Sequence, residues 1–240
     1  MSAIRILVIS GAGISAESGI PTFRGKDGYW RNLDPAKLAT PEAFQRNPNL
    51  VWEWYRERRE RIRSAKPNPA HAAIVRLSLL AGDFLLVTQN VDDLHVRAGL
   101  PKEKMVQIHG DIFETCCSRC AKKIEEEEGE EKDLPRCPDC GALMRPGVVW
   151  FGERLDPAKI DIVENYLSTG PCDLVLVIGT TALFGYIVDW ALRARANGGE
   201  LVEINPEETP LSRAATRCIR NPAAVALPKL VENLLDRQRA

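Results

Sequence analysis

Short runs of Ile, Val and Leu recur along the chain, and a glycine or a polar turn follows each of them. The clearest runs cover residues 4–9, 84–87, 174–178 and 201–204. Continuous apolar runs of this length are typical of strands that are buried on both faces of a parallel sheet. Segments with a helical pattern lie between the runs, at residues 71–81, 156–168 and 186–197. This alternation predicts an α/β fold with a doubly wound parallel sheet.

Two stretches do not follow the alternation, and we interpret both as insertions into the sheet domain. Residues 25–70 have a helical and loop-like pattern, and residues 113–145 contain two closely spaced pairs of cysteines. The two insertions could together form a smaller lobe. The sheet domain is then expected to comprise residues 1–24, 71–112 and 146–240. In such folds ligands bind at the carboxyl edge of the sheet, where the polar turns after the strands meet.

Composition and charge narrow the class of function. The chain has 240 residues, of which 45% are hydrophobic, so a substantial core is available. The formal net charge of −1 gives no general electrostatic reason to expect direct nucleic-acid binding. No apolar run approaches the roughly 20 residues that cross a bilayer, and the N-terminus lacks the features of a signal peptide. We therefore expect a cytoplasmic protein without a membrane segment.

The seven cysteines indicate a metal site rather than disulfide bonds. Two C-x-x-C pairs are typical of a zinc ribbon, in which four thiolates surround one tetrahedral Zn²⁺. The predicted ligands are Cys117, Cys120, Cys137 and Cys140. Four sulfur ligands leave no position for water or substrate, so this zinc is expected to be structural. Cys172 and Cys218 have no partner at a useful spacing, and we expect both to be buried as small hydrophobic residues.

The glycines of GAGISA, residues 11–16, follow the first predicted strand and match the G-x-G-x-x-G/A pattern of a pyrophosphate-binding turn. The same residues could also form a simple tight turn. A dehydrogenase would place an Asp or Glu at the end of a second strand about 20 residues later. Residues 18–34 have no strand character, so hydride transfer is disfavoured while a bound dinucleotide is not. Asn205 and Glu207 follow a later apolar run and could bind ribose hydroxyls, or they could belong to a proline turn.

The charged segment WEWYRERRER, residues 52–61, has two interpretations. Charge runs on helices are usually solvated surface. Tyr55 and Arg58, however, are three residues apart, so their side chains share one helix face. A phenol beside a guanidinium can bind a small organic carboxylate. The segment alone leaves both interpretations open. The other arginines are expected to be solvated, namely Arg56, Arg59 and Arg61.

Taken in order, several longer motifs resemble those of the sirtuins, which are NAD-dependent protein lysine deacylases. The motifs are GAGISAESGIPTFR, TQNVDDLHVRAG, IHGDIFE, the paired C-x-x-C, RPGVVWFGE and EINPE. The resemblance extends from about residue 5 to about residue 230. It implies a Rossmann-type NAD-binding domain, a small zinc-containing lobe, and a cleft in which NAD meets an acyl-lysine protein or peptide.

The resemblance also implies roles for individual residues. The catalytic residues would be His109 and Asn90. The NAD contacts would be Gly11, Ala12, Gly13, Ser15, Glu17, Thr22, Phe23, Arg24, Tyr29, Trp30, Gln89, Asn90, Val91, Asp92, Gly179, Thr180, Thr181, Asn205, Pro206, Glu207 and Ala223. The strand that pairs with the substrate peptide would contain Val148, Val149 and Phe151. His71 and His95 match no such role, and we expect both to be structural.

In the implied reaction, the amide oxygen of the acyl-lysine attacks the ribose as nicotinamide leaves, and Asn90 and Asp92 bind the nicotinamide amide. A neutral His109 then acts as general base and removes a proton from a ribose hydroxyl. Water finally releases free lysine and acyl-ADP-ribose. Two alternatives remain open: transfer of ADP-ribose to a protein side chain, and a non-catalytic NAD-sensing or zinc-dependent interaction module.

One sirtuin class accepts acidic acyl groups, and Tyr55 and Arg58 match its Tyr-x-x-Arg pattern. Ala39 likewise matches a small residue that leaves the acyl channel wide. The resemblance therefore implies removal of succinyl and malonyl as well as acetyl groups. The chain departs from the usual sirtuin pattern at residues 182–188, where Tyr186 occupies the position expected for proline.

Overall fold

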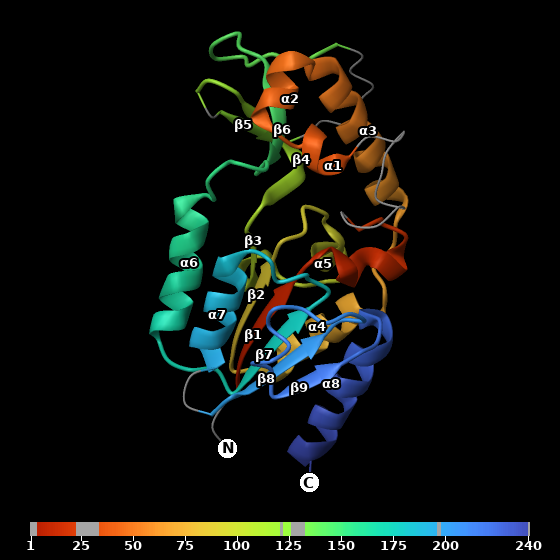
Figure 1. Ribbon diagram of the computed structural model, residues 1–240, viewed down its shortest axis with the longest axis vertical. Coiled ribbons are helices and arrows are strands. Elements are labelled where there is room, and N and C mark those ends of the chain that lie inside the picture. The colour runs from red at the N-terminus through yellow and green to blue at the C-terminus, as the bar shows by residue number, and fades with distance from the viewer. Residues whose placement is uncertain (1–3, 23–33, 121, 126–132, 196–197, 240) are drawn as a thin grey trace.

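Six parallel strands form the central sheet of the computed structural model, which describes residues 4–22, 34–120, 122–125, 133–195 and 198–239 (Figure 1). The strands are β1 (Arg5–Ser10), β2 (Asp83–Thr88), β3 (Met105–Gln107), β7 (Leu174–Ile178), β8 (Glu200–Ile204) and β9 (Arg217–Ile219). The apolar runs predict β1, β2, β7 and β8 correctly, and the doubly wound parallel sheet is confirmed. The pattern does not predict β3 and β9, which have three residues each and form the two edges.

The strand order, β3-β2-β1-β7-β8-β9, reverses its direction of growth at β1. The chain builds β2 and β3 on one side of β1 and then crosses to place β7, β8 and β9 on the other side. The loops that follow β1 and β7 therefore diverge at the carboxyl edge. Such a switch point is where open α/β sheets bind their ligands.

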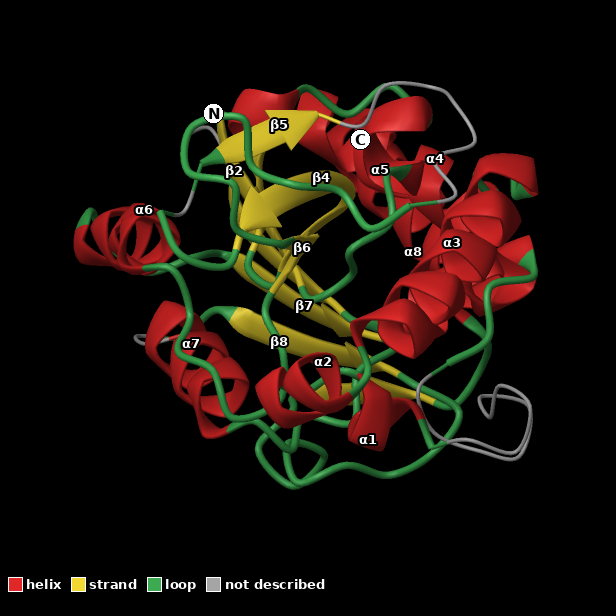
Figure 2. Cartoon of the chain, turned by 90° about the horizontal axis from the view of Figure 1, so that it is seen from above, coloured by secondary structure: helices red, strands yellow, loops and turns green. Residues whose placement is uncertain are grey.

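Helices cover both faces of this sheet (Figures 1 and 2). The helices of this domain are η1 (Ala12–Ser18), α4 (Pro69–Leu80), α5 (Leu94–Arg97), η3 (Lys102–Lys104), α6 (Pro157–Ser168), α7 (Gly185–Arg195) and α8 (Ala223–Arg239). α4 and α8 share a core with Val8 of β1, and α6 and α7 share a second core with Ile9. Adjacent residues of a strand point to opposite faces, so β1 contributes to both cores. None of the described helices is both long and apolar enough to cross a membrane.

Several helices begin with the same two-residue signal, a small polar residue followed by proline. The pairs are Asp34-Pro35, Thr40-Pro41, Asn47-Pro48, Asn68-Pro69 and Asp156-Pro157, which start α1 (Pro35–Leu38), α2 (Pro41–Arg46), α3 (Pro48–Ser64), α4 and α6. In each pair the polar side chain accepts a backbone N–H of the first helical turn. Proline supplies a helical φ where no N–H is needed, so both residues favour a helix start at that point.

The two insertions pack against each other above the carboxyl edge of the sheet (Figure 1). Their elements are α1 (Pro35–Leu38), α2 (Pro41–Arg46), α3 (Pro48–Ser64), β4 (Gly110–Cys117), β5 (Lys123–Glu125) and β6 (Met144–Val148). β4 pairs antiparallel with both β5 and β6. The indole Nε1 of Trp52 donates to the Met144 carbonyl at 3.0 Å, and Val51 of α3 shares a core with Ile112 and Trp150. The lobe is therefore held by α3 lying across β4 and β6.

Arg59 of α3 is buried, so the prediction that it is a solvated surface residue is wrong. Its side chain is 3% exposed and donates to the carbonyls of Ile112 at 2.6 Å and Glu114 at 3.1 Å. Buried carbonyl oxygens need donors, and a guanidinium can satisfy several of them at once. Arg61, in contrast, is exposed and pairs with Glu57 at 3.3 Å, as expected for a solvated helix face.

Candidate functional site

Two glycine turns meet at the switch point of the sheet. The N–H of Gly11 donates to Ile178 O at 2.9 Å, and the N–H of Gly13 donates to Gly179 O at 2.8 Å. A Cβ on Gly13 would lie 2.7 Å from the Cα of Gly179. A Cβ on Gly179, whose φ is +59°, would lie 2.6 Å from the amide nitrogen of Ile14. Only glycine fits at both positions, so the two turns approach each other through their backbones at these points.

A buried polar cluster lies beside these turns and joins three predicted NAD contacts. The Ser15 hydroxyl donates to the Asp92 carboxylate at 3.0 Å. The Asn90 amide donates to Ser15 Oγ at 3.0 Å and to Asp92 Oδ2 at 3.2 Å. Burial raises the pKa of Asp92, while the N–H of Leu94 and the Ser15 hydroxyl oppose this shift. The cluster therefore offers amide and carboxyl groups in a site that excludes bulk water.

His71 and His95 lie behind this cluster, with ring centroids 4.9 Å apart. His71 Nδ1 accepts the N–H of Asn68 at 3.2 Å, and its Nε2 lies 3.4 Å from Ser15 Oγ. Burial lowers the pKa of His71 to about 4 and holds the pKa of His95 well below its ordinary value. Both rings are buried, which agrees with the structural role expected for them.

His109 is fixed through both ring nitrogens. Its Nδ1 lies 2.9 Å from the carbonyl oxygen of Gln89, and a carbonyl can only accept, so Nδ1 carries the proton. Its Nε2 lies 2.6 Å from the Tyr186 hydroxyl, which must therefore donate to the lone pair. Burial lowers the pKa of His109, partly opposed by the bond to Gln89, and the Lys159 charge lowers it further. His109 is thus a neutral imidazole with its basic nitrogen directed at a phenol.

The segment after β6 connects His109 to the small lobe. The N–H of Val149 donates to His109 O at 2.8 Å, and the N–H of Phe151 donates to Ala39 O at 2.9 Å. Val148 is the last residue of β6, so Val149 and Phe151 lie beyond the strand on which the sequence placed them. Phe151 is 42% exposed and Val148 is buried. The segment runs from the backbone of His109 to the end of α1 and leaves the Phe151 side chain partly exposed.

Tyr55 and Arg58 lie together on α3, as the helical spacing predicts. The indole Nε1 of Trp150 donates to the Tyr55 hydroxyl at 2.9 Å. The guanidinium carbon of Arg58 lies 4.7 Å from the Trp54 ring centroid and 5.5 Å from that of Tyr55. Burial raises the pKa of Tyr55 and lowers that of Arg58, and the charge of Asp92 acts on Arg58 in the opposite direction. This pair therefore lies within electrostatic reach of the buried polar cluster.

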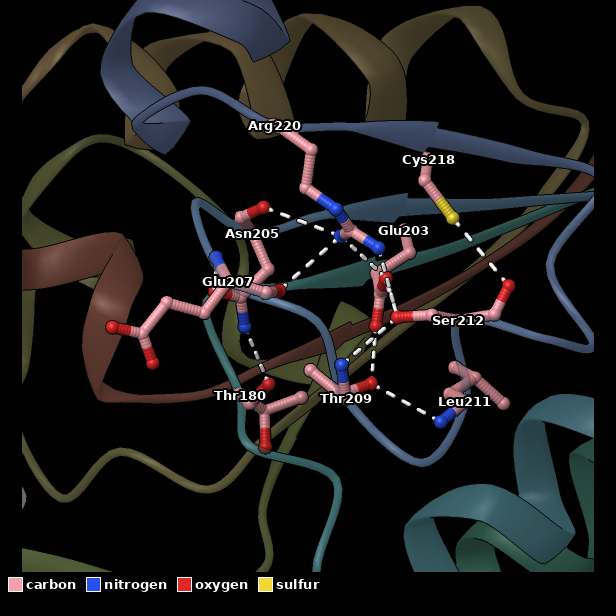
Figure 3. A network of polar contacts seen from close by, with 9 residues as sticks. All are labelled: Thr180, Glu203, Asn205, Glu207, Thr209, Leu211, Ser212, Cys218 and Arg220. Atoms are coloured by element: carbon pink, nitrogen blue, oxygen red, sulfur yellow. Dashed lines mark hydrogen bonds and ion pairs between the residues drawn. The ribbon is translucent and has the colours of Figure 1, made fainter.

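A second network organises the loop after β8 (Figure 3). Glu203 is 1% exposed, accepts from the Ser212 hydroxyl at 2.6 Å, and forms an ion pair with Arg220 at 2.6 Å. The same guanidinium donates to the carbonyls of Asn205 at 3.3 Å and Glu207 at 3.2 Å. The network thus holds the backbone of residues 205–207 through two of its carbonyl oxygens.

Asn205 and Glu207, two predicted ribose contacts in this loop, differ in whether their side chains belong to the network. Asn205 Nδ2 donates to Thr180 O at 2.7 Å, and its Oδ1 accepts the N–H of Glu207 at 3.1 Å. The Asn205 amide therefore joins the loops after β7 and β8. The side chain of Glu207 is exposed and points away from the network in Figure 3. The Glu207 carboxylate therefore takes no part in this network.

The remaining predicted NAD contacts surround these loops. Gln89 Nε2 donates to Thr180 Oγ1 at 2.9 Å, and the Val91 carbonyl accepts the N–H of Ile112 at 3.0 Å. Glu17 accepts the N–H of Ala224 at 3.4 Å, one residue beyond Ala223. Side chains at the rim are half-buried or exposed, namely Ala12, Thr22, Thr181 and Pro206. Four predicted contacts lie outside the described residues, namely Phe23, Arg24, Tyr29 and Trp30.

The four predicted zinc ligands form one cluster, in which all sulfur atoms lie within 4.8 Å of one another. The Sγ atoms of Cys117 and Cys140 are 3.4 Å apart, and those of Cys120 and Cys137 are 3.5 Å apart. A tetrahedral Zn²⁺ with Zn–S distances of about 2.3 Å separates its sulfurs by about 3.8 Å. The donor set and its spacing therefore fit one structural zinc.

Backbone donors stabilise the thiolate form of Cys117. The N–H groups of Cys120 and Arg119 donate to Cys117 Sγ and lower the pKa of that thiol to about 6, which assists binding of a cation.

Two other cysteines, Cys172 and Cys218, are not part of this cluster. Cys172 is buried, as expected, but Cys218 is exposed, so the prediction that it is buried is wrong. β9 is an edge strand, and Cys218 therefore lacks a covering layer.

Residues 11–184 match the model of the Sir2 family. A protein of Leptospira interrogans, serovar copenhageni, named an NAD-dependent protein deacylase, is 45% identical over 97% of this chain and 94% of its own length. A protein of the same name from Aquifex aeolicus is 41% identical over 99% of this chain and 98% of its own. Among solved structures, a Sir2 homologue–NAD complex matches with a TM-score of 0.90 and 40% identity over 98% of this chain and 91% of its own. A complex of Sir2 with a p53 peptide and NAD⁺ matches with a TM-score of 0.81 and 30% identity over 99% of this chain and 95% of its own.

Proposed function

The chain belongs to the Sir2 family, and we propose that it uses NAD as a co-substrate to remove acyl groups from protein lysine side chains. The observation that carries this proposal is the state of His109. It is a buried, neutral imidazole whose Nδ1 proton is committed to Gln89, so that Nε2 alone is available as a base. Its ring is held by the carbonyl oxygen of Gln89, the residue before Asn90 of the buried polar cluster, and its own carbonyl accepts the N–H of Val149.

The buried polar cluster fits the departure of an amide leaving group. When bound, NAD supplies an activated ribose carbon and nicotinamide as the leaving group. Asn90 and Asp92 carry donor and acceptor groups that match a carboxamide, and their burial strengthens such hydrogen bonds. Ser15, which His71 contacts in turn, fixes the orientation of Asn90 and Asp92 before the ligand arrives.

His109 supplies the base for the later step. A neutral imidazole can take the proton of a ribose hydroxyl, which prepares that oxygen for attack on the acyl carbon of the lysine amide. The products are nicotinamide, acyl-ADP-ribose and free lysine. The backbone at residues 148–151 carries the peptide beside His109, and Phe151 contributes an exposed apolar contact.

We further propose that Tyr55 and Arg58 select acidic acyl groups such as succinyl and malonyl. Arg58 carries a positive charge at a half-buried position, where it could form a charge-assisted hydrogen bond with a carboxylate. The Tyr55 hydroxyl accepts from Trp150 and keeps its own proton for donation to the same carboxylate. Ala39, the residue that follows α1, would add little volume to an acyl channel between this pair and residues 148–151.

The division into lobes belongs to this proposal. Residues 1–24, 71–112 and 146–240 would bind NAD, while residues 25–70 and 113–145 would form the lobe that closes over the acyl-lysine. Structural zinc would hold the second insertion, which contributes few apolar residues to the core around the cysteines. The exposed rim, including Thr181 and Glu207, would contact the nucleotide from the sheet domain.

A panel of lysine peptides carrying acetyl, succinyl or malonyl groups tests the function directly. With NAD present, mass spectrometry should detect free lysine peptide, nicotinamide and acyl-ADP-ribose in equal amounts. A peptide that gains the mass of ADP-ribose would instead support ADP-ribosyl transfer. NAD binding without any nicotinamide release would support a non-catalytic sensing module.

A further inference from the structure

Tyr186 occupies the lone pair that His109 needs for base catalysis. The imidazole Nδ1 donates to Gln89 O, so Nε2 has a single lone pair, and the Tyr186 hydroxyl lies 2.6 Å from it. A ribose hydroxyl cannot donate to the same lone pair at the same time. Either the phenol leaves when substrate binds, or the proton reaches His109 through the phenol.

The surroundings of Tyr186 hold its ring in place. Its ring centroid is 5.0 Å from that of Trp190 and 5.6 Å from that of Phe184, with Phe184 stacked at 18°. Trp190 is buried and its Nε1 donates to Glu164 of α6 at 2.8 Å. Tyr186 lies in the first turn of α7, whose Ile187 and Ala191 are part of the core. Moving the phenol away from His109 would disturb the packing of the Tyr186 ring against Phe184 and Trp190.

The phenol oxygen is able to accept a second proton donor. A tyrosine hydroxyl has one proton and two lone pairs, and the proton is used on His109. Among the described residues, His109 is the hydrogen-bond partner of this hydroxyl. The phenol can therefore accept from an incoming hydroxyl while it still donates to Nε2.

We infer that Tyr186 is a further catalytic residue that relays the ribose proton to His109, an inference that rests on the proposed function. In this step the ribose O–H bond breaks as a new O–H bond forms at the phenol oxygen. At the same time the original phenol O–H bond breaks, and its proton forms the Nε2–H bond of an imidazolium. The phenol is regenerated, the ribose oxygen keeps the electron pair with which it attacks, and the net change is one proton moved to His109.

The electrostatics of Tyr186 fit a concerted transfer. Burial raises the pKa of Tyr186 above that of an ordinary phenol, which disfavours a free phenolate. Burial lowers the pKa of His109, so the imidazole is neutral and ready to accept at pH 7. A relay in which both protons move together avoids the phenolate that a stepwise transfer would require.

The test is Tyr186→Phe, which retains the ring and removes the hydroxyl. Two reactions are measured with one acyl peptide: formation of acyl-ADP-ribose, and acyl-peptide-dependent exchange of labelled nicotinamide into NAD. Exchange reports nicotinamide departure and return, which precede proton removal. We expect acyl-ADP-ribose formation to fall by about ten- to a hundredfold, since positioned proton transfer contributes at least this much. Exchange should remain within about twofold of wild type.

Tyr166→Phe is the matched control, because the Tyr166 hydroxyl donates to Ile6 O at 2.9 Å near the start of β1, away from His109. It should leave the ratio of the two rates unchanged. A Tyr186→Phe enzyme that forms product as fast as wild type, or faster, overturns the relay and makes Tyr186 a displaceable cap. Equal loss of both reactions also overturns it, in favour of a purely structural role. A wild-type protein without either reaction would instead refute the proposed function.

Discussion

The indole nitrogen of Trp150 donates to the hydroxyl of Tyr55 at 2.9 Å and so ties α3 to the segment that follows β6. Both side chains are buried, and Phe44 packs on Trp150 with its ring centroid at 5.4 Å. The bond fixes the phenol beside Arg58 before any ligand is present. The proposed acyl pocket is therefore preorganised by a contact between the first insertion and the segment that follows β6.

Arg58→Met should reduce removal of succinyl and malonyl groups by about tenfold or more while removal of acetyl groups survives. A charge-assisted hydrogen bond of roughly 1.5–3 kcal/mol corresponds to this factor. The measurement is kcat/KM for matched acetyl and succinyl peptides. Arg61→Met is the control, because Arg61 is exposed on the same helix and should change neither rate. Equal loss of both activities in Arg58→Met would reject the pocket.

Tyr55→Phe should lower the free energy of unfolding by about 1–3 kcal/mol, because the buried N–H of Trp150 loses its acceptor. Denaturant titration measures this change. The double variant Tyr55→Phe/Trp150→Phe removes both partners and should lose less than the sum of the two single variants. Strict additivity would show that the bond contributes nothing.

His109→Ala should reduce acyl-ADP-ribose formation by about 10²- to 10⁴-fold, the usual contribution of a general base. The active form is the neutral imidazole, and burial lowers its pKa below the ordinary value of 6.5. The kcat/KM of the wild type should therefore be constant around neutral pH and fall only as the pH drops below about 6.5. An acid limb centred above pH 6.5 would contradict this assignment.

Stability should also depend on pH through His71. Its pKa is about 4 in the folded protein and 6.5 as an ordinary histidine, so the unfolded chain binds a proton that the folded chain refuses. The neutral ring contributes stability that is fully present above pH 6.5 and is lost as the pH falls towards 4. The loss amounts to roughly 3 kcal/mol, from a shift of about 2.5 pH units. Thermal unfolding between pH 4 and pH 7 measures it, and His71→Gln should flatten the dependence.

Cys117→Ser should release the metal and unfold the lobe around β4, β5 and β6, since structural zinc contributes folding free energy. Metal analysis should give about one zinc per wild-type chain and much less for the variant. Cys218→Ser is the control, because Cys218 is exposed and lies outside the cluster. Full zinc retention by Cys117→Ser would show that the ligand set is wrong.

Local signals in the sequence predict most of the sheet, because β1, β2, β7 and β8 are buried on both faces and read as continuous apolar runs. The apolar pattern does not reveal β3 and β9, because an edge strand of three residues has too few positions to show it. The N-cap–Pro pairs mark helix starts well because both residues act within one turn.

The sequence predicts the site less well where a side chain forms a hydrogen bond with a group that is far away along the chain. Arg59 belongs to the buried stripe of Trp52, Tyr55 and Ile62, whose spacing of three and four residues could have revealed it. The sequence offers Asn205 as a ribose contact or as part of a proline turn, and its short-range pattern does not disclose its bond to Thr180 O, 25 residues away. In the sequence, Tyr186 stands out only as a departure from the usual sirtuin pattern, since its contact with His109 requires α7 to lie beside the end of β3.

The interlocked glycine turns have an evolutionary consequence. Any side chain at Gly13 or Gly179 would force the loops after β1 and β7 apart, so these positions cannot be used to adjust cofactor affinity. Thr181 and Glu207 are exposed at the rim of the same site and carry no comparable constraint. Selection in the laboratory for altered nucleotide preference should therefore accumulate substitutions at Thr181 and Glu207, while Gly13 and Gly179 stay unchanged.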